Sequence, residues 1–173
     1  TMVKREYEKL IEKGEQDIII SSCCHSVNLL VGKHYPELAK YLAPVVSPMQ
    51  AHCLDIKRRY PNSKTVFIGP CLAKKDEGNT GAVDAVITFK ELSTMLKASC
   101  IIVENRMDEN MESRARLFPT VGGILKTMEC TSKAYTYLTI DGVENCKSAL
   151  EDIARGNTGR CFIEMSACAG SCI

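Results

Sequence analysis

The chain has 173 residues, a formal net charge of +1 and 25% charged residues. This length allows one or two domains with a buried core, and the near-neutral charge excludes the strong positive field that nucleic acid or an anionic membrane would attract. The longest apolar run is far too short to span a bilayer, and ten cysteines fall short of the density of a small disulfide scaffold.

The N-terminal sequence and the cysteines indicate a compartment. No signal-peptide pattern opens the chain, so we expect a cytoplasmic, reducing location with free or metal-bound thiols. The chain stops one residue after Cys172, inside what resembles a ligand loop. We therefore expect it to be a fragment of a longer protein.

The first half of the chain predicts helices and strands in alternation. Apolar residues at helical spacing precede Gly14, and the turn Pro61-Asn-Ser63 leads into the second strand. The expected elements are a helix over 3–13, a strand over 17–22, helical segments around Pro36, a helix over 48–60 and a strand over 65–70.

The second half continues this alternation. The polar stretch 104–116 indicates an irregular segment, and Gly156 is placed to end a helix. The expected elements are strands over 82–89, 135–140 and 161–165, helices over 90–99 and 143–154, and a loop with a short helix over 119–129. Strands alternating with helices predict an α/β fold with mostly parallel sheet, or sheets, flanked by helices.

Three of these strands, each predicted to be buried, run into cysteine. Residues 17–22 lead to Cys23 and Cys24, residues 65–70 lead to Cys71, and residues 161–165 lead to Cys168 and Cys172. Ligands of open α/β sheets bind beyond the carboxyl ends of the strands, so we expect these cysteines to converge on one soft-metal site.

The number of thiols favours an iron–sulfur cubane. Thiolates are the ligands that such clusters select, and Cys24, Cys71, Cys168 and Cys172 supply the four that a cubane needs. A zinc ribbon, which usually has two C-x2-C pairs, and a thioredoxin-like site, which needs C-x-x-C after a strand, fit the spacing less well. Buried core cysteine remains the structural alternative for each position.

The other five cysteines stand in helical or strand patterns without a partner, and core packing is the expected role of each. These are Cys53, Cys100, Cys130, Cys146 and Cys161.

Three motifs resemble a known family. Residues 21–24 (Ser-Ser-Cys-Cys), 69–77 (Gly-Pro-Cys-Leu-Ala-Lys-Lys-Asp-Glu) and 164–172 (Glu-Met-Ser-Ala-Cys-Ala-Gly-Ser-Cys) are similar, in order, to the three signature loops of the iron-only (FeFe) hydrogenase catalytic domain. Those loops are written T-S-C-C-P, M-P-C-x-x-K-x-x-E and E-x-M-A-C-x-G-G-C. The segments His34-Tyr-Pro-Glu37 and Val83-Asp-Ala-Val86 look like the same family, so the resemblance covers nearly the whole chain.

The resemblance implies a cofactor and its ligands. In the family a 4Fe-4S cluster is joined through a cysteine sulfur to a two-iron subcluster, and the whole is called the H-cluster. By similarity Cys24, Cys71 and Cys168 would hold the cubane, and Cys172 would also bridge to the two-iron unit. Because the family's catalytic domain extends well before the first loop, we expect apo protein or partial metal occupancy for this piece.

The resemblance also implies roles around the two-iron unit. Cys23 would be the proton-shuttling thiol, and Lys74 would donate a hydrogen bond to a cyanide ligand. A solvated lysine is the alternative for Lys74, and Glu77 either braces its loop by pairing with a basic residue or faces water. Gly69, Pro70 and Ser166 would contact the cofactor.

Several positions depart from the family pattern. His25 replaces a proline, Val27 stands where a tryptophan is common, and Gly69 and Ser166 stand where productive enzymes have methionine. Losing two large side chains predicts a larger, wetter pocket, and the hydroxyl of Ser166 adds a hydrogen-bonding group.

The family's proton path is also changed. Ala43 falls at the position of a relay serine and Val3 at that of a relay glutamate, whereas Glu6 matches a second acidic position. Without relay groups at hydrogen-bond distance, turnover should be slow. His25 offers a substitute shuttle, with a solvated histidine as the alternative.

These departures, with a short spacing between the second and third loops, resemble the branch regarded as hydrogen sensors. The resemblance implies reversible oxidation of dihydrogen to protons and electrons, slow or used for sensing. Its implied partners are an electron carrier such as ferredoxin, maturation proteins, and ferredoxin-type and PAS domains of the same chain.

Two alternatives stay open. The first is a non-catalytic 4Fe-4S module for electron transfer, cluster trafficking or partner interaction, which would need neither Cys23 nor Lys74. The second is an α/β domain with thiols and no cluster.

Overall fold

The computed structural model describes residues 2–104, 113–129 and 132–172. The chain divides into two compact units, each with its own parallel sheet. Unit 1 comprises Thr1–Pro48 and Ala115–Ile173, and unit 2 comprises Met49–Arg114. The α/β prediction with parallel sheets and flanking helices is confirmed.

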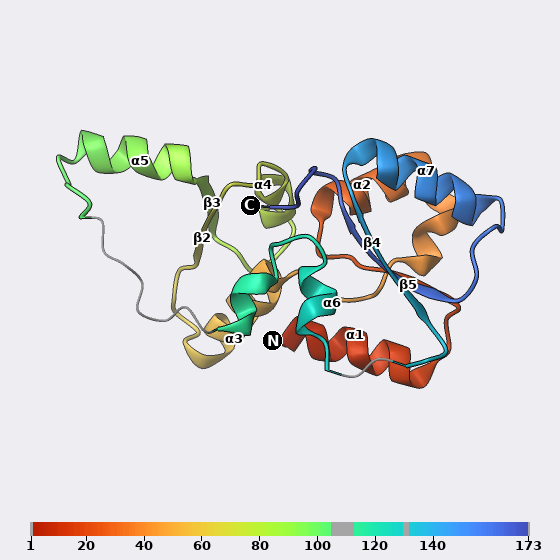
Figure 1. The fold of residues 1–173 in the computed structure, drawn as a ribbon. Coiled ribbons are helices and arrows are strands. Elements are labelled where there is room, and N and C mark those ends of the chain that lie inside the picture. Colours follow the sequence, from red (N-terminus) through yellow and green to blue (C-terminus); the bar gives the residue numbers. More distant parts are fainter. Residues whose placement is uncertain (1, 105–112, 130–131, 173) are drawn as a thin grey trace. The chain divides into compact units, whose positions relative to one another are not determined.

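Unit 1 contains a three-stranded sheet in the order β1-β5-β4 (Figure 1). The strands are β1 (Ile18–Ile20), β4 (Thr136–Asp141) and β5 (Cys161–Ser166), and both pairs are parallel. Strand β5 lies in the middle, and its first five residues are buried, as expected for a parallel strand covered on both faces.

Helices cover the two faces of this sheet. One face packs against α2 (His25–His34), the 3-10 turn η1 (Pro36–Tyr41) and α7 (Val143–Ala154), through a core that includes Val31, Leu150 and Ile163. The other face lies against α1 (Met2–Lys13) and α6 (Gly123–Thr127), as Figure 1 shows.

Two of these helices have the sequence features that predicted them. Val3, Tyr7 and Ile11 are spaced by four residues, and all three are buried on α1. Gly156 follows α7 with a φ of +74°, the left-handed conformation that glycine adopts without strain after a helix.

Unit 2 is built on a two-stranded parallel sheet of β2 (Val66–Gly69) and β3 (Ala85–Thr88). Its helices are α3 (Pro48–Arg59), α4 (Ala73–Gly78) and α5 (Phe89–Ala98), and the 3-10 turn η2 (Arg114–Leu117) follows. The buried residues Met49, Cys53 and Val83 form its core.

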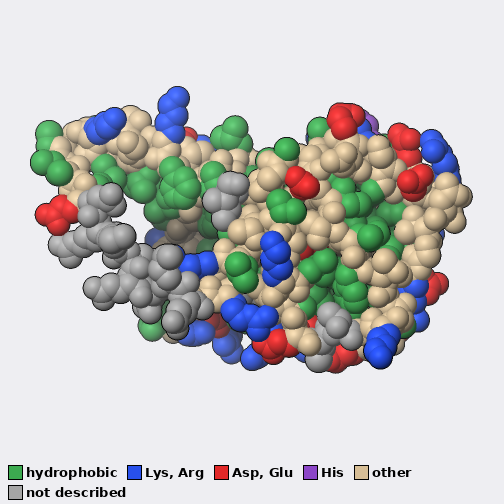
Figure 2. Space-filling model, viewed as in Figure 1, with side chains coloured by type: hydrophobic (Ala, Val, Ile, Leu, Met, Phe, Trp, Pro, Cys, Tyr) green, Lys and Arg blue, Asp and Glu red, His purple; other side chains and the backbone are tan. Residues whose placement is uncertain are grey.

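The strand predicted over residues 65–70 is present as β2, but the prediction that it is buried is wrong. Val66 is 54% exposed and Ile68 is 41% exposed, because only one face of the two-stranded sheet packs against the small core. Figure 2 shows hydrophobic side chains along α5 as well, where Phe89 and Met95 are exposed.

Two sequence predictions fall on residues outside the described part. The irregular segment predicted over 104–116 includes residues 105–112, and the core role predicted for Cys130 concerns another such residue. Within the described residues, no helix is long and apolar enough to cross a membrane.

Candidate metal centre

Two of the three cysteine loops leave the same edge of the sheet in unit 1. Strand β1 pairs with β5 so that Ile20 lies beside Ile163, and the amide of Ser21 donates to the carbonyl of Ile163 at 2.9 Å. The amide of Met165 donates to Ser21 Oγ at 3.1 Å. The loop with Cys23 and Cys24 and the loop after β5 therefore start side by side.

The third loop belongs to the other sheet. Cys71 follows β2, which pairs only with β3 among the described strands. Two of the three loops therefore follow strands of one sheet, and the third loop follows a strand of a second sheet. The sequence could not reveal this, because strand pattern does not say which strands share a sheet.

The first loop is held by hydrogen bonds on both sides of Cys23. Ser22 Oγ donates to the carbonyl of Val45 at 2.5 Å, and Asn28 Nδ2 donates to the carbonyl of Ser22 at 2.8 Å. Cys24 is the N-cap residue of α2, so its side chain lies at the start of that helix. Neither Cys23 nor Cys24 forms a disulfide, and both are partly exposed.

Tyr7 is a site residue that the sequence analysis missed. Its hydroxyl lies 3.1 Å from Cys23 Sγ and accepts a hydrogen bond from the amide of Ser22 at 3.0 Å. The pKa of Tyr7 is raised well above its ordinary value, first by burial and then by the nearby Cys23. Its helical spacing indicated only a core position, and nothing local pointed to its hydroxyl.

The loop after β5 is fixed by contacts to distant residues. The amide of Gly170 donates to Asp141 Oδ2 at 2.7 Å, and the amide of Cys172 donates to the carbonyl of Pro119 at 3.1 Å. Cys168 and Cys172 form no disulfide, and both are exposed. The sequence analysis did not identify Asp141, which lies at the end of β4 beside Ser166.

Ser166 and Ser171 brace this loop from within. Their hydroxyls lie 2.9 Å apart, so Ser166 has a hydrogen-bonding partner in the protein. Ser171 adopts a φ of +66°, although the family motif has glycine at its position. A serine in the left-handed region carries a backbone strain that the surrounding contacts must offset.

Glu164, the first residue of the third motif, supports α6. Its carboxylate accepts the amides of Ile124 at 3.2 Å and Leu125 at 3.0 Å, and the residue is 7% exposed. Burial raises the pKa of this carboxyl, and the backbone hydrogen bonds offset part of that shift.

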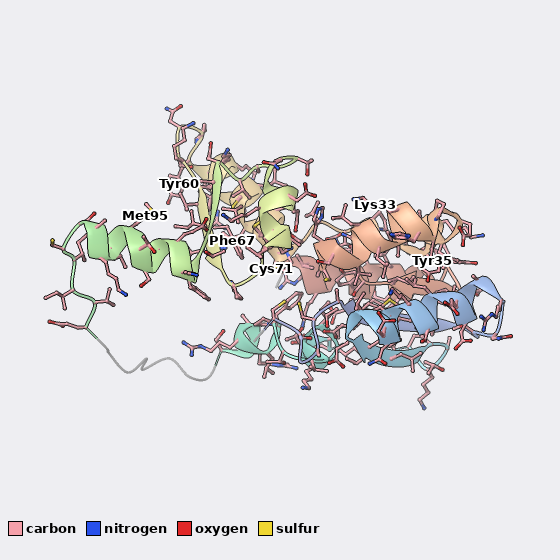
Figure 3. All side chains as sticks on the ribbon, turned by 90° about the horizontal axis from the view of Figure 1, so that it is seen from above. Lys33, Tyr35, Tyr60, Phe67, Cys71 and Met95 are labelled. Carbon is pink, nitrogen blue, oxygen red and sulfur yellow. The ribbon has the colours of Figure 1, made fainter. Side chains whose placement is uncertain are left out.

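In unit 2, Gly69 ends β2 and is packed by an aromatic ring. A Cβ at Gly69 would lie 2.8 Å from Phe67 Cε1, so the Phe67 ring occupies the space beside this residue (Figure 3). Gly69 by itself therefore opens no space in unit 2. Pro70 is exposed, and Cys71 is a free, partly exposed thiol.

Lys74 and Glu77 pair within helix α4. The Lys74 ammonium donates to the Glu77 carboxylate, and each side chain is 12% exposed. The solvated alternative for Lys74 is therefore wrong. Of the two readings of Glu77, pairing with a basic residue is confirmed.

The changed proton-path positions lie in different surroundings. Val3 is 3% exposed and Ala43 is 4% exposed, and both are core residues without a proton-carrying side chain. Glu6 is exposed and pairs with Lys9 at 2.7 Å. His25 begins α2 and is partly buried.

Three of the remaining cysteines are core residues as predicted, namely Cys53, Cys146 and Cys161. Cys146 also donates to the carbonyl of Ser166 at 3.4 Å, and burial raises the pKa of its thiol to about 11. The core role predicted for Cys100 is wrong, because this residue follows α5 in an exposed, left-handed conformation.

The donor chemistry fits a thiolate-bound cluster. Within the described ranges, no three histidine, cysteine or acidic side chains are gathered closely enough to bind a single metal ion. The predicted ligands are cysteines without disulfides at loop positions, and a cubane is larger than one ion and is held by four cysteine thiolates.

The described residues form parallel α/β units in which cysteine-bearing loops follow three of the strands. The model of the family "Iron only hydrogenase large subunit, C-terminal domain" matches residues 1–173. The chain belongs to this family.

The relatives that match this chain include two iron hydrogenases. The periplasmic Fe hydrogenase large subunit of Nitratidesulfovibrio vulgaris is 23% identical, and the match covers 96% of this chain and 53% of that protein. Iron hydrogenase 1 of Clostridium pasteurianum is also 23% identical, over 99% of this chain and 40% of that protein. The chain thus spans about half the length of these relatives or less.

Solved structures share the fold. An apo FeFe-hydrogenase HydA1 from Chlamydomonas reinhardtii superposes with a TM-score of 0.69 at 15% identity, covering 98% of this chain and 64% of that chain. A FeFe-hydrogenase from a study of oxygen inactivation and the 2Fe subcluster of the H cluster gives 0.65 at 17% identity, covering 99% and 66%.

Proposed function

We propose that this chain carries ligand loops of an H-cluster domain and takes part in the reversible oxidation of dihydrogen to two protons and two electrons. The family assignment supports this function. The observation that carries it is the common sheet edge in unit 1, from which the Cys23–Cys24 loop and the Cys168–Cys172 loop both leave.

The proposed ligands are Cys24, Cys71, Cys168 and Cys172, with Cys172 bridging to the two-iron unit. None of the four forms a disulfide, and Cys24 lies at the N-terminus of α2. When bound, the H-cluster would supply the irons at which the H–H bond is broken or formed.

The chain's own side chains would handle protons and charge. Cys23 would hold a proton at Sγ, next to the ligand Cys24. Lys74 would place a positive charge beside an anionic cofactor, and Gly69, Pro70 and Ser166 would contact it. Cys23 Sγ lies within hydrogen-bond distance of the Tyr7 hydroxyl, which suits a group that must be correctly placed.

We also propose that turnover is slow and serves hydrogen or redox sensing. Buried Val3 and Ala43 support this proposal, because neither can pass a proton at the positions where the family has a relay glutamate and serine. Glu6 is engaged by Lys9 at the surface.

The wider assignments remain proposals as well. A carrier such as ferredoxin would exchange the electrons, maturation proteins would deliver the two-iron unit, and ferredoxin-type and PAS domains would belong to the same protein. None of the nine described cysteines forms a disulfide, which supports the proposed cytoplasmic location.

The alternative is a non-catalytic 4Fe-4S module. The ion pair of Lys74 with Glu77 favours it, because a carboxylate of the protein already compensates the ammonium that a catalytic site would use. In that case Cys23→Ser and Lys74→Ala would leave every cluster property of the protein unchanged.

The first experiment is anaerobic reconstitution with iron and sulfide, followed by iron counting and electron paramagnetic resonance. We expect about four irons per chain and a reduced-cubane signal. Replacing Cys24, Cys71, Cys168 or Cys172 by alanine should each lower the iron content.

Matched controls remove thiols that are not proposed ligands. Cys100→Ser changes an exposed cysteine and Cys23→Ser changes the neighbour of a ligand, and both should retain the iron. Equal iron in the Cys71→Ala variant would contradict the ligand assignment. No cluster signal in any preparation would contradict the proposed function.

A further inference from the structure

Tyr7 is a residue of helix α1, and its side chain packs against strand β5. Its side chain is fully buried, and its ring meets that of Phe162 edge to face, with 5.4 Å between centroids and an interplanar angle of 76°. Because a buried ring in this arrangement has one position, the hydroxyl at its end is fixed in space.

That hydroxyl meets three atoms of the Ser22–Cys23 segment. It accepts the amide hydrogen of Ser22 at 3.0 Å, and it lies 3.1 Å from Cys23 Sγ and 3.3 Å from Ser22 Oγ. It thus fixes both the backbone that leads to Cys23 and the sulfur of Cys23 itself.

The hydrogens can be assigned along a continuous chain. Ser22 Oγ donates its only hydrogen to the carbonyl of Val45, so it can only accept from Tyr7. One arrangement then runs from the thiol of Cys23 to the Tyr7 oxygen, from the Tyr7 hydroxyl to Ser22 Oγ, and on to Val45. In the other arrangement the Tyr7 hydroxyl donates to Cys23 Sγ, and the hydrogen bond between Tyr7 and Cys23 is kept with its direction reversed.

We propose that Tyr7 is the positioning residue of Cys23. It keeps the Cys23 sulfur in one orientation from a buried anchor on α1, at a place where the relay positions Val3 and Ala43 provide no polar contact. This inference rests on the proposed role of Cys23 as the proton-carrying thiol, which works only if the sulfur stays within hydrogen-bond reach of its partner.

The test measures the thiol of Cys23 directly, in protein without added iron. The S–H stretching band of Cys23 is identified by subtracting the infrared spectrum of the Cys23→Ser variant from that of the unchanged protein. Tyr7→Phe removes one oxygen atom, and we expect the Cys23 band to move and broaden as the sulfur loses its fixed partner. An unchanged band would overturn the proposal.

A matched control removes another buried tyrosine hydroxyl. Tyr135 is 5% exposed and donates to the carbonyl of Gln16, which precedes β1 at the opposite end of the strand from Cys23. Tyr135→Phe should leave the Cys23 band in place. A shift equal to that of Tyr7→Phe would mean that the band reports loss of stability only, and would overturn the proposal.

A reciprocal measurement does not depend on the folding of the Tyr7 variant. Cys23→Ala retains Tyr7, and we expect the Raman bands that report phenol hydrogen bonding to change in the difference spectrum. No change there would contradict the contact.

Reconstitution separates this inference from the proposed function. We expect Tyr7→Phe to bind as much iron as the unchanged protein, and, in the matured protein, to lower kcat for hydrogen by about 2- to 10-fold, the effect of losing one hydrogen bond. A protein that binds no cluster would refute the function while the infrared result still decides whether Tyr7 positions Cys23. Full kcat together with a shifted band would overturn the positioning role in turnover.

Discussion

At the scale of single residues, the buried polar groups of unit 1 connect the sheet to its helices. Glu164 points from β5 to the N-terminus of α6, and Tyr7 reaches from α1 to the Cys23 loop. A buried polar group without a partner costs stability, so each such group restricts the arrangements that its neighbours can adopt.

Glu164 should make stability depend on pH. Burial raises the pKa of its carboxyl above the ordinary value of 4.5, so the folded state binds the proton more tightly than the unfolded state. The stability that the protonated Glu164 side chain contributes is fully present below pH 4.5, and it is lost as the pH rises through the pKa of the folded state. Glu164→Gln should therefore flatten the decline in unfolding free energy over this window, measured by urea unfolding at several pH values.

Two further variants make this prediction sharp. Glu164→Ala leaves the amides of Ile124 and Leu125 without their acceptor and should cost about 1–3 kcal/mol. Glu144 is exposed on α7, so Glu144→Gln should leave the pH profile unchanged. A profile that is identical in the Glu164→Gln variant would show that another group titrates in this range.

At the scale of elements, helix α5 depends on its cap because it has no buried residue. Thr88 and Glu91 form a capping box: Thr88 Oγ1 accepts the amide of Glu91 at 3.2 Å, and the Glu91 carboxylate accepts the amide of Thr88 at 2.7 Å. The hydrogen bond from Lys75, followed by those from Thr88, lowers the pKa of Glu91 to about 2.

Thr88→Ala should destabilise unit 2 by about 1 kcal/mol, the usual cost of losing an N-cap side chain.

The capping box should also make stability depend on pH. Because the pKa of Glu91 is lowered in the folded state, the stability that its carboxylate contributes is present above pH 4.5 and is lost as the pH falls toward about 2. Urea unfolding followed by circular dichroism measures both effects. Thr94→Ala, in the exposed middle of the same helix, is the control, and an equal loss there would contradict the capping role.

At the scale of the whole molecule, the two units differ in how much core each contains. The main core of unit 1 includes eleven buried residues from its sheet and helices, whereas that of unit 2 includes three. Because buried apolar area provides most of the stability of a domain, unit 2 should open more readily.

Hydrogen exchange followed by mass spectrometry measures this difference. We expect amides of α5 and β2 to exchange well before those of α7 and β5. Helices α5 and α7 are the matched pair, with 10 and 12 residues, so a difference between them reports packing rather than helix length. Equal protection of the two helices would contradict the prediction.

The sequence alone determined the elements and the identity of the loops. Helical spacing of Val3, Tyr7 and Ile11, the apolar run before Cys23 and the glycine after α7 are local signals, and each produced the element that it indicated. The three cysteine motifs indicated the family for the same reason, because a motif is read from neighbouring residues.

The tertiary structure alone decided which strands share a sheet and which polar groups meet. The strand before Cys71 joins β3 in a second sheet, whereas the strands before the other two cysteine loops share the sheet of unit 1. Tyr7 meets Cys23 across 16 positions in the sequence, Gly170 meets Asp141 across 29, and Glu164 meets Ile124 across 40. Such contacts depend on how the strands pair and on which faces the helices cover, and no local pattern in the chain encodes that choice.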